Sequence, residues 1–221
     1  MVCIPVARII FYSCKKDEKP AINFHFGYFG LTQGRYVEYD VMEINHDAPF
    51  KKHDTTRYRL KTLIGEPTID NSGRTANVFY RSIFNSIYQT YEVKDAWTAI
   101  IDEYRAELVE ENQRIIKLVF SPTKYKEWNM NAFNSFEPLT IYYSKIHEPY
   151  EINGFSFDST VTVLQDSIFD MFDFTKKYEV YAKGIGLIKK HYQEFTIQNF
   201  DISRPLKGTE KFYSLVGYGM E

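Results

Sequence analysis

Cysteine is almost absent from this sequence. The 221-residue chain has two, Cys3 and Cys14, and both lie within its first fourteen residues. The chain after residue 14 therefore has no thiol for a disulfide framework, a thiolate metal site or a cysteine nucleophile. Packing and hydrogen bonding must fix the fold of that part.

Long apolar runs and an excess of positive charge are also missing. Beyond residue 14 the apolar runs are as short as Leu118-Val119-Phe120, whereas a membrane-spanning helix needs about 20 such residues. The 27 Lys and Arg residues face 29 Asp and Glu residues, which gives a net charge of −2. Without a broad positive field the chain is not expected to bind nucleic acid.

Motifs for common catalytic and cofactor sites are missing as well. There is no Gly-x-Ser-x-Gly elbow and no phosphate-binding glycine loop, and Gly184-Ile185-Gly186 lacks the third glycine of a dinucleotide fingerprint. Of the five histidines, His46 and His53 flank one loop and would converge if it were a hairpin end. A solvated polar loop is the favoured interpretation, so we expect no metal and no cofactor.

Carboxylates are common enough to keep one enzymatic alternative open. Asp102-Glu103, Glu110-Glu111 and Asp158 are examples, and a glycosidase needs two such groups as acid and base. Carboxylates usually lie on solvated surfaces. A hydrolase with paired carboxylates is therefore the alternative to a protein without enzymatic activity.

Aromatic residues are abundant, at 17% of the chain with 18 Tyr and 18 Phe, and they favour sheets. Apolar and polar residues alternate from Tyr36, and strands are also expected at residues 57–63, 77–83, 139–147, 155–163, 177–182, 187–195 and 212–216. Asp70-Asn71-Ser72-Gly73 and Asn153-Gly154 supply hairpin turns. The predicted fold is all-β, a mostly antiparallel meander forming a curved sheet or a partly closed barrel or sandwich.

One segment allows a second interpretation. Trp97, Ile100, Ile101, Tyr104 and Leu108 have helical spacing, which would give an α+β fold with one helix near residues 96–109. Alternatively, Glu110-Glu111-Asn112-Gln113 turns a hairpin and Trp97, Ala99 and Ile101 share one strand face. We favour strands.

The N-terminus resembles a lipoprotein signal peptide. An apolar stretch ends at Ser13, directly before Cys14, and Lys15-Lys16-Asp17-Glu18 follows. In such signals a peptidase cleaves before a cysteine that then carries acyl chains, and two or more chains hold a protein on a bilayer. The predicted organisation is a degenerate or truncated signal peptide at residues 1–13, a tether at 14–22 lipidated at Cys14, and a single β-rich domain at 23–221.

Short motifs spread over the chain resemble a family of uncharacterised Bacteroidetes lipoproteins. The matching stretches are Tyr28-Phe29-Gly30-Leu31, Gly34-Arg35-Tyr36-Val37-Glu38-Tyr39, Lys117-Leu118-Val119-Phe120, Trp128-Asn129-Met130-Asn131, residues 157–163 and residues 178–188. The family typically has Pro at the position of Gly30 and an aromatic residue near Val37. The resemblance implies an all-β lipoprotein domain and a Bacteroidetes source, and it implies no activity.

Trp97, Trp128, Asn129 and Asn131 are the predicted ligand-contacting residues, because indole rings beside amides suit carbohydrate or apolar ligands. The alternative is a Trp in the core and amides that bond nearby backbone. We expect a non-enzymatic envelope lipoprotein that palmitate-type acylation anchors in the outer membrane. A position at the cell surface is compatible with this anchor. Its ligand would be a glycan, a lipid or an envelope protein.

Overall fold

The computed structural model describes residues 23–221 and consists almost entirely of β-strands. The predicted signal peptide, tether and Cys14 lie outside the described residues. The strands are β1 (Arg35–Asp47), β2 (Lys52–Ile69), β3 (Thr75–Asn85), β4 (Thr90–Ile101), β5 (Arg105–Glu110), β6 (Gln113–Val119), β7 (Glu127–Asn129), β8 (Thr140–Ile152), β9 (Phe155–Phe169), β10 (Asp173–Ala182), β11 (Gly186–Thr196) and β12 (Lys207–Met220). Two short 3₁₀-helices, η1 (Phe26–Tyr28) and η2 (Ala48–Phe50), complete the described elements.

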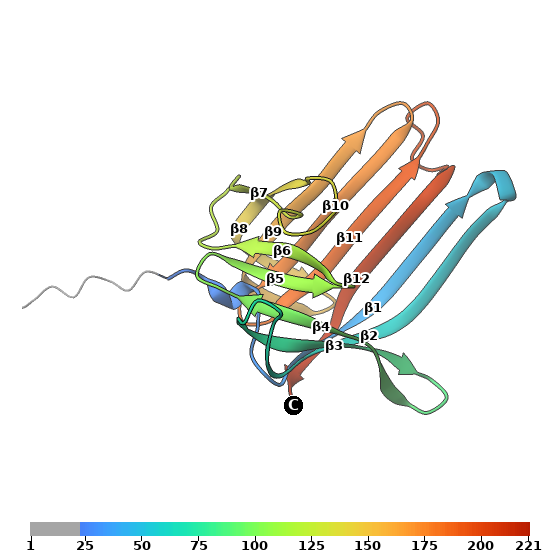
Figure 1. Cartoon of the computed structure of the whole chain (residues 1–221). Helices are drawn as coiled ribbons and strands as arrows, with labels where there is room; N and C mark the ends of the chain where they lie inside the picture. Colours follow the sequence, from blue (N-terminus) through green and yellow to red (C-terminus); the bar gives the residue numbers. More distant parts are fainter. Residues whose placement is uncertain (1–22) are drawn as a thin grey trace, which may run out of the picture.

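All twelve strands belong to one antiparallel sheet, in the order β6-β5-β4-β3-β2-β1-β12-β11-β10-β9-β8-β7. Neighbours in the sheet are neighbours in the chain, except that the first strand, β1, pairs with the last, β12, from Arg35 opposite Met220 to Asp47 opposite Lys207. The sheet curls on itself, so β3 to β6 pass in front of the lower part of the long strands (Figure 1). The predicted all-β meander with a partly closed barrel is confirmed.

The two edges of the sheet nearly meet, which almost closes the barrel. An isolated bridge joins Arg114 of β6 to Phe133, and the Ile116 amide donates to the Met130 carbonyl at 3.0 Å. The Trp128 indole N–H donates to the Ile116 carbonyl at 3.1 Å. The segment after β7 therefore takes the place of a longer edge strand beside β6, and few backbone groups of that edge remain open.

The helix considered for residues 96–109 is wrong, and the strand interpretation of this segment is confirmed. β4 and β5 pair from Thr98 opposite Val109 to Ile101 opposite Ala106. Asp102 turns the chain between them, because its Oδ1 accepts the amides of Tyr104 and Arg105 at 2.8 Å each. Periodicity alone cannot separate the two structures over so short an apolar segment, and the turn residues decide it.

The hairpin turn predicted at Asn153-Gly154 is confirmed between β8 and β9. Asn153 and Gly154 have φ of 49° and 83°, the left-handed backbone that a two-residue turn between antiparallel strands needs. β8 extends to Ile152, beyond the residues 139–147 expected for it. The Asn153 side chain donates from Nδ2 to the Leu215 carbonyl at 2.8 Å, so the tip of this hairpin is fixed against β12.

Two clusters of buried side chains form the core. Members of the first come mainly from β6, β8, β9 and the segment around Trp128, and members of the second from β1, β2 and β10 to β12. Examples are Tyr28, Leu118, Trp128, Ile141, Tyr143 and Val163 in the first, and Val37, Tyr39, Leu60, Val180, Ile188 and Leu215 in the second. No helix within residues 23–221 is long and apolar enough to span a membrane.

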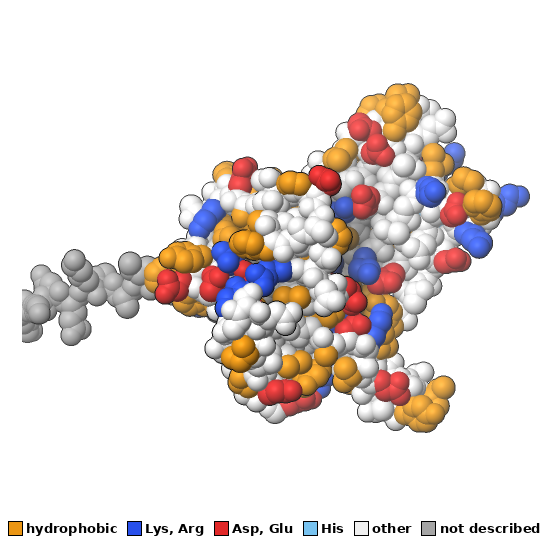
Figure 2. Space-filling view, in the orientation of Figure 1, with side chains coloured by type: hydrophobic (Ala, Val, Ile, Leu, Met, Phe, Trp, Pro, Cys, Tyr) orange, Lys and Arg blue, Asp and Glu red, His pale blue; other side chains and the backbone are white. Residues whose placement is uncertain are grey.

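The long strands β9 to β12, β1 and β2 continue beyond the part of the sheet that β3 to β6 cover (Figure 1). This uncovered part carries charged side chains (Figure 2), among them the ion pairs Lys211–Glu43 at 2.9 Å and Lys177–Glu194 at 2.7 Å. The turns at the far ends of these strands instead expose large apolar side chains, namely Phe50, Ile168, Phe169, Met171, Phe172, Phe200 and Ile202. These turns lie at the opposite end of the molecule from residue 23 (Figure 1).

Candidate functional site

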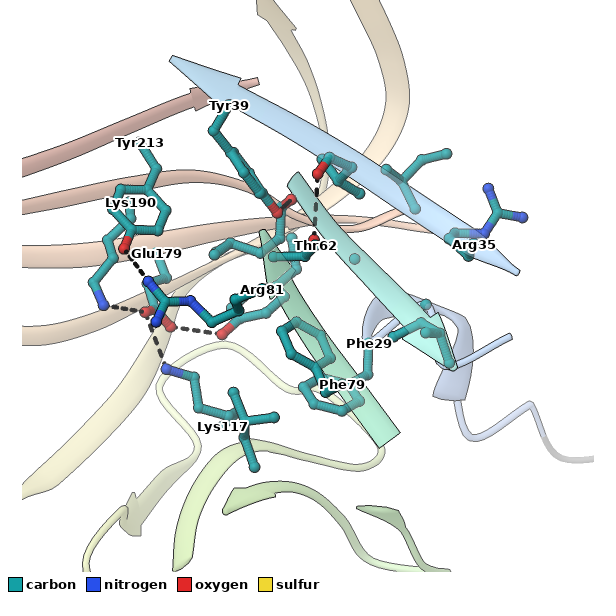
Figure 3. A pocket seen from close by; sticks show the side chains of 18 of the residues that line it. Phe29, Arg35, Tyr39, Thr62, Phe79, Arg81, Lys117, Glu179, Lys190 and Tyr213 are labelled. Atoms are coloured by element: carbon teal, nitrogen blue, oxygen red, sulfur yellow. Dashed lines mark hydrogen bonds and ion pairs between the residues drawn. The ribbon is translucent and has the colours of Figure 1, made fainter. Parts of the chain in front are cut away.

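A cavity of about 90 Å³ lies inside the curved sheet. Side chains from β1 to β6 and from β10 to β12 line it, together with Phe29 and Gly30, which follow η1. Figure 3 shows aromatic side chains such as Phe29 and Phe79 on one side and a group of charged side chains on the other. The cavity therefore has one apolar wall and one charged wall.

Strand register explains why these side chains meet. Glu179 of β10 lies opposite Lys190 of β11, Lys190 lies opposite Tyr213 of β12, and Tyr213 lies opposite Val41 of β1. Directly opposed residues in an antiparallel pair share a face. One row of side chains therefore runs across four strands, and the curl of the sheet brings Lys117 of β6 to it from the other wall.

The apolar end of the cavity is closed by the segment around η1. The Gly184 amide donates to the Gly27 carbonyl at 2.8 Å, which fixes this segment against the β10–β11 turn. Gly30 has φ of 64°, and a Cβ there would collide with the Ile185 carbonyl group. Glycine is therefore required at residue 30 for the chain to approach β11 so closely.

Glu179 is the centre of the charged wall and is only 1% exposed. Its Oε1 accepts hydrogen bonds from Lys117 Nζ at 3.0 Å and from the Tyr192 hydroxyl at 3.0 Å. Its Oε2 accepts one from the Tyr181 hydroxyl at 2.6 Å. Burial by itself would raise the pKa of Glu179, but the positive charges of Lys117 and Lys190 and these hydrogen bonds outweigh it and lower the pKa to about 2.

The two lysines beside Glu179 differ in how well they are paired. Burial lowers the pKa of Lys117, but the charges of Glu179 and Glu110 outweigh this and the pKa is raised. Lys190 Nζ lies 3.7 Å from Glu179 Oε1, beyond hydrogen-bonding distance. Burial lowers the pKa of Lys190, the Glu179 charge offsets this in part, and the pKa stays below its usual value. Lys190 is thus the less compensated cation.

Trp97 and Arg81 form a second part of the wall. The Arg81 guanidinium lies 4.2 Å from the centroid of the Trp97 ring and donates to Asp95 at 2.5 Å. Its Nη2 also donates to the Tyr213 hydroxyl at 3.3 Å. This stacking holds the indole against the cavity.

The four predicted ligand-contacting residues do not form one surface. Trp97 lines the cavity, whereas Trp128 is 9% exposed and packs 4.9 Å from the Tyr143 ring in the core. Asn129 Oδ1 accepts the amides of Asn131 and Leu139 at 3.0 Å each. The polar groups of Trp128, Asn129 and Asn131 thus bond to backbone, which favours the structural alternative for these three residues, and their role as ligand contacts stays a prediction.

Asn131 has the same structural role as Asn129. Its Nδ2 donates to the Glu137 carbonyl at 2.7 Å, and its Oδ1 accepts from Asn134 Nδ2 at 3.1 Å. These bonds shape the loop between β7 and β8 that lies beside β6. The sequence alone does not distinguish a binding role from a structural role for this motif, because a Trp next to amide side chains occurs in both.

The carboxylates considered for the hydrolase alternative lie in different surroundings. Among residues 23–221, every carboxyl group with a displaced pKa has it lowered; these are Glu43, Glu66, Asp70, Glu107, Asp170, Glu179 and Asp201. Glu110 lines the cavity and lies 3.9 Å from Lys117 Nζ. Asp102 instead belongs to a network in which Arg74 and Arg105 hold the buried Glu107.

His46 and His53 do converge, as opposed residues of β1 and β2. Their Nδ1 atoms are 3.0 Å apart, and His46 Nε2 lies 2.7 Å from Glu210 Oε1. Each ring is therefore engaged in hydrogen bonding. Within residues 23–221 no group of three or more His, Cys, Asp or Glu side chains is arranged to hold a metal ion.

Sequence reasoning missed Lys117, Glu179 and Lys190, the residues that define the charged wall. Lys117 and Glu179 are 62 positions apart, so no local spacing links them. Lys117 and Glu179 each interrupt a mostly apolar run, and Lys190 follows a second lysine, Lys189. Charged residues within apolar runs were the available signal in the sequence. This signal does not show which of these residues contact one another in the folded protein.

Comparison with known proteins gives remote structural similarities. No family model and no curated protein matches the chain. A candidate lipoprotein of Parabacteroides distasonis is 12% identical, with 87% of this chain and 98% of that chain covered and a TM-score of 0.42. A candidate exported protein of Bacteroides fragilis with a YmcC-like fold is 8% identical, with 86% and 98% covered and a TM-score of 0.43.

A third similar structure is a domain of a candidate outer membrane lipoprotein-sorting protein from Vibrio parahaemolyticus. It is 14% identical, with 85% of this chain and 86% of that chain covered and a TM-score of 0.23. The first two similar structures come from Bacteroidetes, the group of bacteria whose lipoproteins the sequence motifs resemble.

Proposed function

We propose that this chain is a cell-envelope lipoprotein whose β-domain binds a small ligand with an apolar body inside the curved sheet. The observation that carries the proposal is the cavity of about 90 Å³ between Phe29, Phe79, Trp97 and the Glu179 cluster. Well-packed interiors have few spaces larger than a water molecule. A cavity with one apolar wall and a few converging polar groups is the usual form of a ligand site.

Binding is better supported than catalysis. Glu179 is ionised at neutral pH because its pKa is lowered to about 2, so it cannot serve as a general acid there. Its oxygens already accept from Lys117, Tyr181 and Tyr192, which makes it a poor base. The geometry instead suits a fixed, pre-organised wall against which a ligand lies.

The envelope location rests on the sequence around Cys14. Residues 15–22 separate Cys14 from Asn23, and even a fully extended chain of this length reaches only about 30 Å. A domain acylated at Cys14 would thus remain close to the membrane that carries it. A ligand released from, or delivered to, that membrane would meet the cavity at high local concentration.

Binding in the cavity is tested by titration with the neutral apolar fluorophore N-phenyl-1-naphthylamine. We expect saturable binding by the wild-type domain and at least about tenfold weaker binding by Thr62→Phe, because the added ring fills the cavity that Thr62 lines. Thr175→Phe is the matched control, since Thr175 is also buried but is not among the lining residues. Equal affinities for the two variants, or no saturable binding by the wild type, would contradict the proposal.

The anchor is tested by intact mass spectrometry of the protein from membrane fractions, expressed from its native locus. We expect a chain that begins at an acylated Cys14, because thiol acylation follows cleavage after Ser13 in lipoprotein signals of the kind this N-terminus resembles. Cys14→Ala should leave residues 1–13 in place and move the protein out of the lipid-linked fraction. An unmodified, soluble wild-type chain that retains residues 1–13 would refute the anchor.

A further inference from the structure

We infer that the ligand of this cavity is a compact amphiphilic acid whose negatively charged head group binds beside Lys190. This inference rests on the proposed function, since it names the chemistry of the molecule bound at the same site. Within the described residues, the side chains that line the cavity include four basic groups, Arg35, Arg81, Lys117 and Lys190, and two acidic groups, Glu110 and Glu179. The lining therefore has more basic than acidic groups, with Arg81 also paired to Asp95.

Lys190 is the cation with capacity to bind an anion. Glu179 is already satisfied at closer range by Lys117 at 3.0 Å and by the hydroxyls of Tyr181 and Tyr192 at 2.6 and 3.0 Å. Lys190 Nζ stays at 3.7 Å from the same carboxylate, and its side chain is 17% exposed. An ammonium carries three donors, so an incoming oxyanion can accept from Lys190 without displacing the contacts of Glu179.

Neighbouring groups add to this site. Tyr213 lies opposite Lys190 in the β11–β12 register, and its hydroxyl oxygen accepts from Arg81 Nη2 at 3.3 Å. The Tyr213 hydroxyl proton is then free to be donated. Figure 3 shows Lys190, Arg81 and Tyr213 gathered on the same side of the cavity as Glu179. A carboxylate there would meet an ammonium and a hydroxyl, with the Arg81 guanidinium close by.

The apolar wall sets the rest of the ligand. Phe29 and Phe79 line the cavity away from the charged group (Figure 3), and an apolar body placed there would leave water. A cavity of about 90 Å³ holds one ring or part of an alkyl chain, so the rest of a bound molecule would extend past the partly exposed Lys190, and a whole membrane lipid would not fit. The class is thus an acid of the medium-chain or aromatic kind, recognised by its head group at Lys190.

The experiment compares octanoate, octanol and octylamine as competitors of N-phenyl-1-naphthylamine at neutral pH. These three molecules share one apolar chain and differ in head-group charge. We expect octanoate to displace the fluorophore at a concentration at least about tenfold lower than octanol, and octylamine to be weakest. Lys190→Met should reduce the octanoate-to-octanol preference to about one, because it removes the under-paired cation.

Lys189→Met is the matched control, since Lys189 precedes Lys190 in β11 but is not among the lining residues and donates to Tyr150 at 3.0 Å. It should retain the wild-type preference. Lys190→Gln serves the same purpose as Lys190→Met should the latter fail to fold.

The outcomes separate this inference from the proposed function. Fluorophore binding with equal displacement by octanoate and octanol, or with octylamine strongest, overturns the inference and leaves the cavity as a binding site. An unchanged octanoate preference in both Lys190 variants also overturns it. A wild-type protein that binds neither the fluorophore nor any competitor overturns both.

Discussion

Glu179→Gln is expected to lower the free energy of unfolding by about 3–5 kcal/mol, because it leaves a buried lysine without its counter-charge. The Lys117 side chain is 8% exposed, and its short contact to Glu179 is 3.0 Å. Glutamine keeps the size of the side chain but removes the negative charge. The measurement is urea denaturation at neutral pH, with the m-value compared between the two proteins to exclude a change in the unfolded state.

Two further variants test whether the loss of stability comes from the buried Lys117 charge. The double variant Lys117→Met, Glu179→Met should regain part of the lost stability, because it removes the uncompensated Lys117 charge, whereas Tyr181 and Tyr192 still lose their acceptor. Glu194→Gln should change stability by less than about 1 kcal/mol, since the Glu194 side chain is 62% exposed and its pair with Lys177 is a surface one. A loss below about 1 kcal/mol for Glu179→Gln would show that Glu179 does not hold the wall together.

The same group predicts a direction for the pH dependence of stability. The pKa of Glu179 falls from 4.5 to about 2 on folding, so the folded state favours the ionised form. A depressed carboxyl pKa stabilises the protein above the unfolded pKa, and this contribution disappears as the pH falls from about 5 towards 2. Glu179→Gln should therefore lose less stability than the wild type over this acidic range.

Trp128→Ala is expected to lower the free energy of unfolding by about 3–5 kcal/mol, since it removes a large core side chain. Trp128 packs against Tyr143 and donates to the Ile116 carbonyl, and so helps to hold the segment after β7 beside β6. Trp97 lines the cavity and is only partly buried. Trp97→Ala should therefore cost less stability while weakening fluorophore binding.

Urea denaturation and fluorophore titration of both Trp variants separate the two roles. The opposite pattern of results would support the ligand surface at residues 128–131 that the sequence predicts. In that pattern Trp128→Ala would fold with near wild-type stability and lose its ligand, and Trp97→Ala would bind normally.

Local patterns in the sequence were sufficient for the strands but not for their assembly. Alternation marked most strands, and Asn153-Gly154 specified its hairpin because that backbone needs left-handed residues. The segment from Trp97 to Leu108 was ambiguous, since its apolar residues fit both periods. The pairing of Arg35 with Met220 joins the two ends of the described chain, and no local pattern encodes such a contact.

The candidate site was harder to predict from the sequence than the fold. Trp97, which lines the cavity, is among the predicted ligand contacts, whereas no local pattern singled out Glu179 and Lys190. They are buried because the sheet curls, and curvature arises from the summed twist of many strands rather than from any one residue. The burial of Trp128 likewise depends on the assembled sheet, since β6 lies beside it and the Ile116 carbonyl accepts its indole N–H.

The most direct test of a ligand site inside the curved sheet is an NMR measurement of intermolecular nuclear Overhauser effects between octanoate and the methyl groups of the isotope-labelled domain. We expect contacts from the octanoate chain to Val37, Ile64, Leu108 and Leu187, which line the cavity. Contacts confined to the exposed turn residues Ile168, Met171 and Ile202, with none to the cavity methyl groups, would contradict it.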